Sequence, residues 1–437
     1  MADPPADLEI RPLRPGDDPD AQLDLSERAF GPGFGTDRDR RLRSLSRLVA
    51  GGRYLGAFAG GRPAAAAAIQ DMRQWWRGRP VPMAGVSSVT VAPEYRGLGI
   101  GRLLMTALLD EIAARRYPLS ALFPATMPLY RSLGWELAGA RDTAVIPARS
   151  LLRLVPPDAL PPDALPPDAV PPDALPPAPP APPRLHRAGP GDAEAVTAVL
   201  GRVHEAARDC GPITWDAASA AEWLADPGLY AYLAEDGVLA YRWHHRDLFA
   251  ERAEAISART VRGFWAQLGS HASIADNVQA RIGPASAFWW LTQERDAQIA
   301  RRSRWMLRVV DAAAAIAARG FPAGVSVRVP VRIADGARPA NSGRWQLTVA
   351  DGAGTLEPLG PAGTAGPAST VGTAGPASTA ALPASPLTLG ARGLAALYAG
   401  TPLVTLRQAG LAAGGTAADD AALDAAFAAT PYMLDAF

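Results

Sequence analysis

A proline-rich tract in the first half of the chain limits what this sequence can fold into. Residues Pro156–Pro183 read PPDALPPDALPPDAVPPDALPPAPPAPP, which repeats a pentapeptide. Proline lacks a backbone N–H group and favours extended polyproline geometry, so we expect no helix or sheet to run through this tract. The sequence therefore predicts a linker over residues 151–183 that separates an N-terminal domain, residues 1–150, from the rest of the chain.

The charge balance and the cysteine content exclude several classes of protein. Lys+Arg and Asp+Glu are both 43, so the net charge is zero and indicates no nucleic-acid or membrane partner. The single cysteine, Cys210, permits no disulfide within the chain and no cysteine-based metal site. The N-terminus lacks the pattern of a signal peptide, and no segment reaches the roughly 20 apolar residues of a membrane helix. We expect a soluble, cytoplasmic protein.

The N-terminal domain has the pattern of a mixed α/β fold. Its first residues, LEIRPLRPGDDPDAQLDLSERAF, are typical of a strand, a turn and a helix, and strands joined by Gly and Pro turns follow. After a further strand, YPLSALFP, the segment TMPLYRSLGWE predicts a short helix with Pro128 in its first turn and Gly134 past its end. An amphipathic helix precedes the strand YPLSALFP. Its apolar residues recur at helical spacing (Ile100, Leu103, Leu104, Ala107, Leu108 and Ile112).

Two more domains are expected after the linker. Over residues 184–302, RLHRAGPGDAEAVTAVLGRVHEAA repeats the strand, turn and helix of the first domain, which predicts a related domain. Over residues 303–437, SRWMLRVVDAAAAIAARGFP predicts a helix, and strands and a last helix follow, which is typical of an α+β domain. A tandem nonapeptide inside it, GTAGPASTVGTAGPASTA, predicts an unstructured loop over residues 361–381.

The segment Val89–Leu109, VTVAPEYRGLGIGRLLMTALL, joins a strand to the amphipathic helix through a turn with three glycines. Free N–H groups at a helix start carry partial positive charge, and glycine lets an anion approach the backbone closely. The turn therefore predicts a phosphate site, although a turn that serves packing alone is the alternative. A P-loop would need a lysine, which the chain lacks, and a dinucleotide site would need a different glycine spacing.

Arg96 and the glycines after it match the pattern R/Q-x-x-G-x-G/A, and with the preceding SVTVAPEYR they resemble the coenzyme A site of the GNAT acetyltransferases. With YPLSALFPATMPLYRSLGW and the two later domains, the whole chain resembles the Eis (enhanced intracellular survival) family of GNAT N-acetyltransferases. The resemblance implies tandem GNAT folds, the second degenerate because it lacks the glycine turn, and a C-terminal sterol-carrier-protein-like domain. It also implies a homohexamer that acetylates amines with acetyl-CoA, such as those of aminoglycosides, polyamines or lysine side chains.

The expected site residues follow from this resemblance, motif by motif. Tyr130, in PLYRSLGW, matches the general acid of the family, and the family's general base is the α-carboxylate of the last residue, here Phe437. Contacts to acetyl-CoA are expected from the strand (Val89, Thr90, Val91), from the turn (Arg96, Gly97, Leu98, Gly99, Ile100, Gly101, Arg102) and from the residues before the short helix (Ala125, Thr126).

These groups suit acetyl transfer to an amine. A phenol of reference pKa ~10 is close to the thiol it would protonate, and no histidine precedes residue 186 to supply a base in the first domain. A carboxylate of reference pKa ~3.5 is a weak base, so we expect Phe437 to accept a proton as the C–N bond forms, or through water. Ser88 and Ala436 depart from the family pattern on the acceptor side, which leaves the identity of the amine open.

Other readings of the sequence remain. Trp243–His245 could suggest a metal site, but neighbouring histidines on a strand point to opposite sides and no ligand cluster accompanies them, so no metal is expected. The alternative function is a non-catalytic protein that binds acetyl-CoA or, through its third domain, a lipid. The glycine turn together with Tyr130 favours the enzyme, because a scaffold needs neither.

Overall fold

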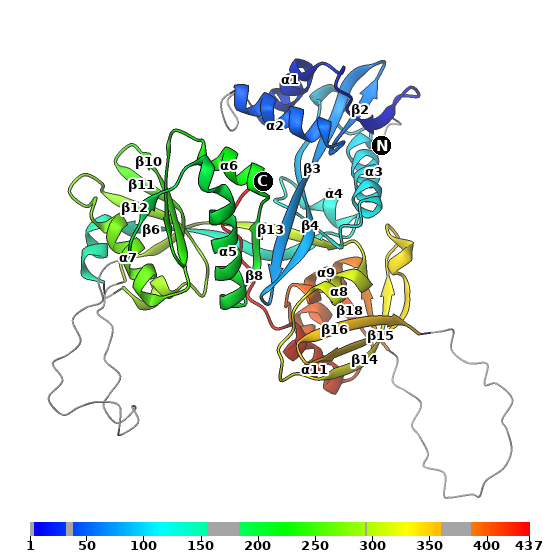
Figure 1. Ribbon diagram of the computed structural model, residues 1–437. Coiled ribbons are helices and arrows are strands. Elements are labelled where there is room, and N and C mark those ends of the chain that lie inside the picture. The colour runs from blue at the N-terminus through cyan, green and yellow to red at the C-terminus, as the bar shows by residue number, and fades with distance from the viewer. Residues whose placement is uncertain (1–3, 32–37, 155–182, 293–294, 360–385) are drawn as a thin grey trace, which may run out of the picture. The chain divides into compact units, whose positions relative to one another are not determined.

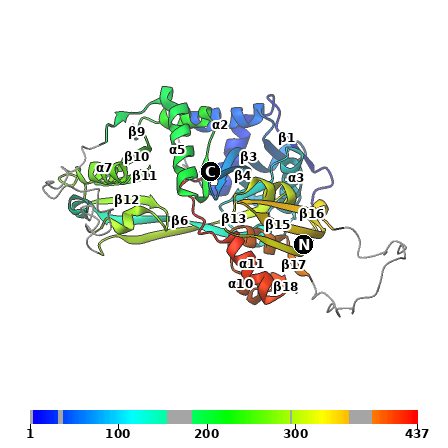
Figure 2. The same ribbon diagram turned by 60° about the horizontal axis from the view of Figure 1, so that its bottom comes forward.

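The computed structural model describes residues 4–31, 38–154, 183–292, 295–359 and 386–437 (Figures 1 and 2). The proline-rich repeat, except for Pro183, and the tandem nonapeptide lie outside the described residues. Contacts divide the chain into two compact units. Unit 1 holds Met1–Gly139, Arg304–Pro431 and Ala436–Phe437, and unit 2 holds Ala140–Ser303 and Tyr432–Asp435.

Unit 1 begins with a sheet in the strand order β1, β2, β3, β4, β5, β13. Neighbouring strands are antiparallel except β4 and β5, which are parallel and are joined by helix α3, as a parallel pair requires. The expected mixed α/β fold is confirmed here. The elements are β1 (Glu9–Pro12), α1 (Pro19–Phe30), α2 (Arg38–Ala50), β2 (Tyr54–Ala59), β3 (Arg62–Trp76), β4 (Arg79–Val91), α3 (Ile100–Ala114), β5 (Leu119–Leu122), α4 (Met127–Arg131) and β13 (Gln298–Val309), which crosses the border of the units.

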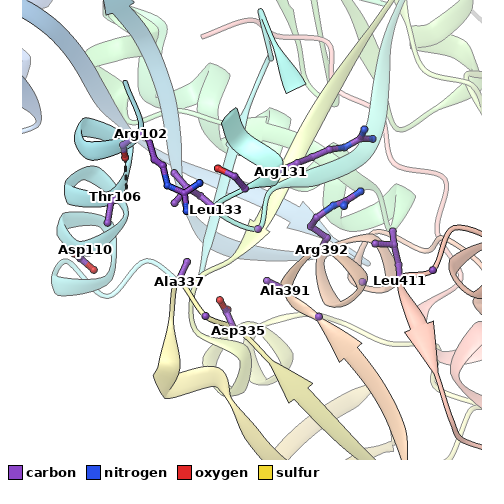
Figure 3. A pocket seen from close by; sticks show the side chains of 16 residues that line it. Arg102, Thr106, Asp110, Arg131, Leu133, Asp335, Ala337, Ala391, Arg392 and Leu411 are labelled. Atoms are coloured by element: carbon purple, nitrogen blue, oxygen red, sulfur yellow. Dashed lines mark hydrogen bonds between the residues drawn. The ribbon is translucent and has the colours of Figure 1, made fainter. Parts of the chain in front are cut away.

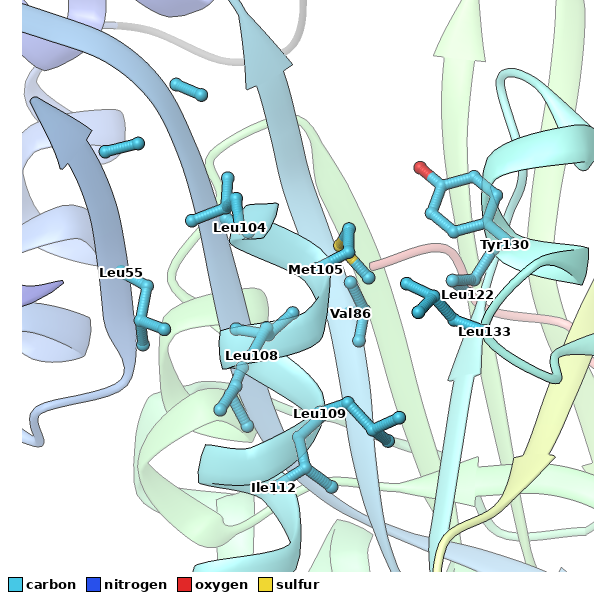
Figure 4. Close-up of a cluster of buried hydrophobic side chains, with 14 of the residues drawn as sticks. Leu55, Val86, Leu104, Met105, Leu108, Leu109, Ile112, Leu122, Tyr130 and Leu133 are labelled. Carbon is cyan, nitrogen blue, oxygen red and sulfur yellow. The ribbon is translucent and has the colours of Figure 1, made fainter. Parts of the chain in front are cut away.

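Helix α3 packs one face into the core of this sheet. Leu104, Leu108 and Ile112 are fully buried, and Figure 4 shows them in one cluster with Leu55 of β2. Leu103 was expected on the same face, but it is 42% exposed. It lies about 100° around the helix from Leu104, which places it outside the apolar stripe. The packed face of α3 fixes where its N-terminus emerges.

Unit 2 repeats part of this topology. Its strands run in the order β6, β12, β11, β10, β9, β7, and β11 and β12 are parallel and joined by helix α7, as β4 and β5 are joined by α3. The elements are β6 (Glu136–Pro147), which crosses the border of the units, β7 (His186–Arg187), α5 (Ala193–Ala207), β8 (Cys210–Thr214), α6 (Ala217–Leu224), β9 (Leu229–Ala234), β10 (Gly237–His244), β11 (Asp247–Ala255), α7 (Ala258–Gly269) and β12 (Asn277–Ile282).

The C-terminal part of unit 1 is an α+β structure on a five-stranded sheet in the order β16, β15, β14, β17, β18. Arg319 is fully buried inside it, and its guanidinium carbon lies 4.7 to 5.4 Å from four aromatic ring centroids, including that of Trp76 at the end of β3. The elements are α8 (Ala312–Ala318), β14 (Val327–Ala334), β15 (Gly343–Ala350), β16 (Ala353–Pro358), β17 (Leu387–Gly390), α9 (Ala391–Tyr398), α10 (Leu403–Gln408), β18 (Ala412–Ala413) and α11 (Ala417–Phe427).

The helix predicted from residue 303 is wrong over its first third. Residues 303–309 belong to strand β13, whose Met306–Val309 pair with β5, and helix α8 begins only at Ala312. Trp305–Val310 are almost fully buried. A short buried run that is apolar except for Arg308 has no period that separates a strand from a helix. Among the described residues, no helix combines the length and the apolar character needed to cross a bilayer.

Candidate functional site

Strand β4 leaves its parallel neighbour partway along its length. It pairs with β5 only over Met83–Gly85, yet it continues to Val91. On its other side β4 bulges against β3 at Ser88, whose φ is +53°. Within the described residues, no strand pairs with Val89–Val91 on the β5 side, so this edge suits the expected backbone contact with an extended ligand.

The turn after β4 depends on glycine. A 3₁₀ turn over Pro93–Tyr95 leads to Arg96, whose Nε donates to the carbonyl oxygen of Val91 at 3.3 Å. Gly97 and Gly99 follow with φ of +82° and +78°, a region that other residues adopt only with strain. The three glycines that the sequence singled out therefore include two whose backbone conformation requires them.

The same turn presents a row of backbone N–H groups. Helix α3 begins at Ile100, and the N–H groups of Arg102 and Leu103 donate back to the carbonyl of Gly99. Within the part of the chain that the structure describes, the N–H groups of residues 97–101 donate to no protein acceptor. Unsatisfied donors at the start of a 15-residue helix form an electropositive surface.

The space and the charge around the turn fit a pyrophosphate. A Cβ added to Gly97 would meet no atom within 4 Å, so the backbone there is open. The first turn of α3 holds no acidic side chain, and the flanking Arg96 and Arg102 are exposed. An anion would thus meet free donors and positive charge without opposing charge from the helix.

The corresponding helix start in unit 2 is closed to an anion. The N-cap Ser257 of α7 accepts from the N–H of Thr260 at 3.2 Å. Asp236 accepts from the N–H of Ser257 at 2.8 Å and from the hydroxyl of Thr260 at 2.5 Å. The N–H groups of Ser257 and Thr260 are satisfied, and the carboxylate of Asp236 lies at this helix start, where it would repel a phosphate. The helix start of α7 therefore differs from that of α3 in having a side-chain cap and a carboxylate beside it.

Tyr130 lies on α4, just beyond β5. The residue is 5% exposed, and its ring meets that of Trp135 edge-on at 6.5 Å between centroids. Its hydroxyl donates to no described protein group, and burial raises its pKa to about 12. The reference pKa of a phenol is close to that of the thiol. Burial therefore moves the pKa of Tyr130 away from the pKa of the group that it would protonate. The expected contact residues Ala125 and Thr126 are exposed in the loop before α4.

Phe437 lies where β4 and β5 part. The Cβ that Gly85 lacks would be 2.9 Å from two ring carbons of Phe437 and 3.0 Å from the sulfur of Met72. The ring of Phe123, directly after β5, meets the Phe437 ring edge-on at 5.8 Å between centroids. Gly85 is the last residue of β4 that pairs with β5. The last residue of the sequence is thus seated beside the open edge of β4.

The candidate residues gather in unit 1. The strand, the turn, α4 and the last two residues all belong to it. The sequence reading missed Met72, Gly85 and Phe123, which receive the ring of Phe437. Only Gly85 carried a signal, because a glycine inside a strand often marks close approach of another group.

A cavity of about 640 Å³ lies between α3, α4 and the C-terminal part of unit 1 (Figure 3). Arg102, expected at the phosphate turn, lines this cavity from α3. Arg131, next to Tyr130, lines it from α4, and Arg392 lines it from the start of α9. Three guanidinium groups from distant parts of the sequence therefore border one space.

The histidine pair differs from its prediction. His244 ends β10, and His245 lies in the following turn with φ of +56°. The two rings do not point apart, and their centroids are 4.8 Å from each other. Among the residues that the structure describes, no three His, Cys, Asp or Glu side chains are grouped to hold a metal ion.

Comparison with known proteins gives two family matches. Residues 9–138 match the acetyltransferase (GNAT) domain, and residues 312–434 match the sterol carrier protein domain. The chain is 26% identical over 376 residues, 79% of its length and 83% of the relative's, to an uncharacterized N-acetyltransferase of Streptomyces avermitilis.

Solved structures match the whole chain. A GCN5-related N-acetyltransferase from Kribbella flavida is 40% identical, with a TM-score of 0.84 over 99% of this chain and 98% of that one. Eis1 from Mycobacterium abscessus has a TM-score of 0.71 over 98% of this chain and all of that one. At 21% identity, Eis1 shows the shared fold, which confirms the expected Eis-like architecture.

Proposed function

We propose, from the premise that the chain belongs to the GCN5-related N-acetyltransferase family, that it moves the acetyl group of acetyl-CoA to a small-molecule or peptide amine. The observation that carries this proposal is the turn at residues 97–101, whose N–H groups have no acceptor among the described residues. Five adjacent donors at a helix start suit the pyrophosphate of coenzyme A. The counterpart turn at α7 is filled by Asp236, so the proposal confines the reaction to unit 1.

The cofactor contacts extend along β4. The backbone of Val89–Val91 would hydrogen-bond the pantetheine arm, because no described strand occupies that side. Arg96 and Arg102 would add positive charge near the phosphates, and Ala125 and Thr126 would border the thioester from the loop before α4. The acetyl group would then lie near the place where β4 and β5 part.

Two residues would handle the protons. The amine nitrogen attacks the thioester carbon, the C–N bond forms, and the C–S bond breaks. Tyr130 gives its phenolic proton to the departing sulfur, and the carboxylate of Phe437 takes a proton from the nitrogen. Since burial raises the pKa of Tyr130 to about 12, the phenol stays protonated and donates only as the sulfur gains charge.

We propose the chemical class of the acceptor amine and not one compound. The ring of Phe437 with Phe123 and Met72 gives this end of the site an apolar wall. An amine on an aminoglycoside-like molecule, a polyamine or a lysine side chain would approach along it in its neutral form. The homohexamer belongs to the same proposal, and it is supported by the resemblance to the Eis family.

Replacing Gly99 by glutamate should block acetyl-CoA binding. The carboxylate would stand among the free N–H groups and repel the pyrophosphate. Like charges about 4 Å apart near a protein surface repel by up to about 4 kcal/mol, which corresponds to binding that is weaker by up to roughly a thousandfold. Titration calorimetry with acetyl-CoA measures the dissociation constant.

The control for this experiment is Gly99→Ala. Alanine introduces the same backbone strain at φ of +78° without a charge. Its loss of affinity should be far smaller than that of Gly99→Glu. If both variants bind acetyl-CoA as the wild type does, the phosphates lie elsewhere.

A further inference from the structure

Helix α4, which carries Tyr130, is too short to be stable through its own hydrogen bonds. It has five residues, and its N-cap, Thr126, makes no side-chain capping bond. A helix of this length gains little from its own hydrogen bonds and depends on tertiary contacts. The hydroxyl of Tyr130 donates to no described protein group, so it adds no anchor. The place of the phenol is therefore set by packing and by whatever holds the end of α4.

A buried carboxylate holds that end. Glu136, the first residue of β6, is 4% exposed. Its Oε1 accepts from Nε and Nη2 of Arg131 at 3.1 and 2.8 Å, and from the N–H of Leu137 at 2.9 Å. Arg131 is the last residue of α4 and directly follows Tyr130. Glu136 thus ties the catalytic helix to the sheet.

The second oxygen of the same carboxylate reaches the C-terminal part of the chain. Oε2 accepts from Nε of Arg392 at 2.6 Å, and Nη2 of Arg392 lies at the same distance. Burial alone would raise the pKa of Glu136, but the bonds from Arg131, Leu137 and Arg392 outweigh it and lower that pKa. The carboxylate is charged and both of its oxygens are occupied.

The backbone around this network leaves little room for movement. Gly134, between α4 and β6, has φ of +93°, and an added Cβ would lie 2.7 Å from the Cβ of Ala391. It would also lie 2.9 Å from the guanidinium of Arg308, which is buried and paired with Asp335 at 2.7 Å. The turn after α4 therefore packs directly on the start of α9.

We propose that Arg392, acting through Glu136 and Arg131, is a positioning residue for Tyr130. The sterol-carrier-like part of the chain then has a function in the acetyl transfer: it supplies the second guanidinium that holds the catalytic helix. This inference rests on the proposed function of Tyr130 as the proton donor. Figure 3 shows Arg131 and Arg392 on the rim of the same cavity, from α4 and α9.

The test is the substitution Arg392→Met in the full chain, which removes the guanidinium and keeps an unbranched apolar stem. We expect kcat to fall roughly tenfold to a hundredfold, since a misplacement of about 1 Å costs on that order. The KM for acetyl-CoA should stay within about twofold, because the guanidinium of Arg392 pairs with Glu136 and with no described residue of the glycine turn. Arg392→Lys, which keeps the charge, should restore part of kcat.

Arg407→Met is the matched control. Arg407 lies on α10 in the same C-terminal part, and its Nε and Nη2 both pair with Asp420 at 2.7 Å. Its side chain is exposed to a similar degree as that of Arg392, 32% against 38%. The control removes a comparable ion pair that has no link to α4, so its kcat should equal that of the wild type.

A double substitution separates positioning from general damage. In a Tyr130→Phe background, Arg392→Met should lower kcat no further, because there is no phenol left to misplace. An equal fall in both backgrounds, or a wild-type kcat for Arg392→Met, would overturn the inference. If the Tyr130→Phe variant has the kcat of the wild type, the proposed function of Tyr130 fails instead. The failure of the inference on Arg392 and the failure of the proposed function are therefore distinguishable.

Discussion

Replacing Tyr130 by phenylalanine should lower kcat roughly a hundredfold to a thousandfold, the usual contribution of a positioned general acid. The substitution removes only the hydroxyl, and the ring keeps its edge contact with Trp135. The KM for acetyl-CoA should stay close to that of the wild type. Thiol release at saturating acetyl-CoA and amine measures the effect.

The same substitution should leave the fold intact. The hydroxyl of Tyr130 donates to no described protein group, so its loss breaks no internal hydrogen bond and the melting temperature should not fall. Tyr54→Phe is the control: Tyr54 is also buried, burial raises its pKa to about 12, and it lies on β2 outside the proposed site. A kcat that drops equally in both variants, or in neither, would remove Tyr130 from the mechanism.

Adding two glycines after Phe437 should abolish turnover and spare acetyl-CoA binding. The extension moves the α-carboxylate away from the ring of Phe437, which packs against Gly85 and Phe123. Loss of a general base costs roughly a hundredfold or more in kcat. The dissociation constant of acetyl-CoA should change by no more than about twofold, because the glycine turn is untouched. Calorimetry and thiol release on the same sample measure both quantities.

Two controls accompany the extended chain. The same two glycines placed before Met1 should change neither quantity. A semisynthetic chain that ends at Phe437 with an amide keeps the ring and removes the charge, so it should lose turnover as the extended chain does. Unchanged turnover in the extended chain would mean that another group takes the proton from the amine.

Local signals made the geometry of parts of the candidate site predictable from the sequence. Gly97 and Gly99 adopt positive φ in a turn that opens a helix, and the N–H groups they expose follow from helix geometry. Pro128 and Gly134 mark the ends of the α4 segment, and both take the expected places. These features depend on neighbours within a few residues, which is why the pattern of the sequence reveals them.

Long-range contacts were not predictable in the same way. Nothing near Phe437 indicates that its ring packs on Gly85, more than 350 residues earlier. Glu136 looks like an ordinary charge after a glycine and a tryptophan, yet it is buried between Arg131 and Arg392. Pairings of this kind depend on which surfaces the tertiary fold brings together, and single-residue propensities do not encode them.

Environment also changed one chemical expectation. The sequence assigns Tyr130 the reference pKa of a phenol, ~10, whereas burial raises it to about 12 in the structure. The cause is the removal of water around the ring, and only tertiary packing determines that. The proposed proton donor is thus held neutral more firmly than the sequence suggests, and its phenol is a weaker acid at rest.

The most direct test of the central claim is thiol release from acetyl-CoA by the full chain, with aminoglycosides, polyamines and lysine peptides offered in turn. The account predicts release that requires an amine, saturates with it and yields an N-acetylated product by mass spectrometry. Tight acetyl-CoA binding with no release on any amine would contradict it, and the chain would then be a coenzyme A-binding protein that performs no transfer.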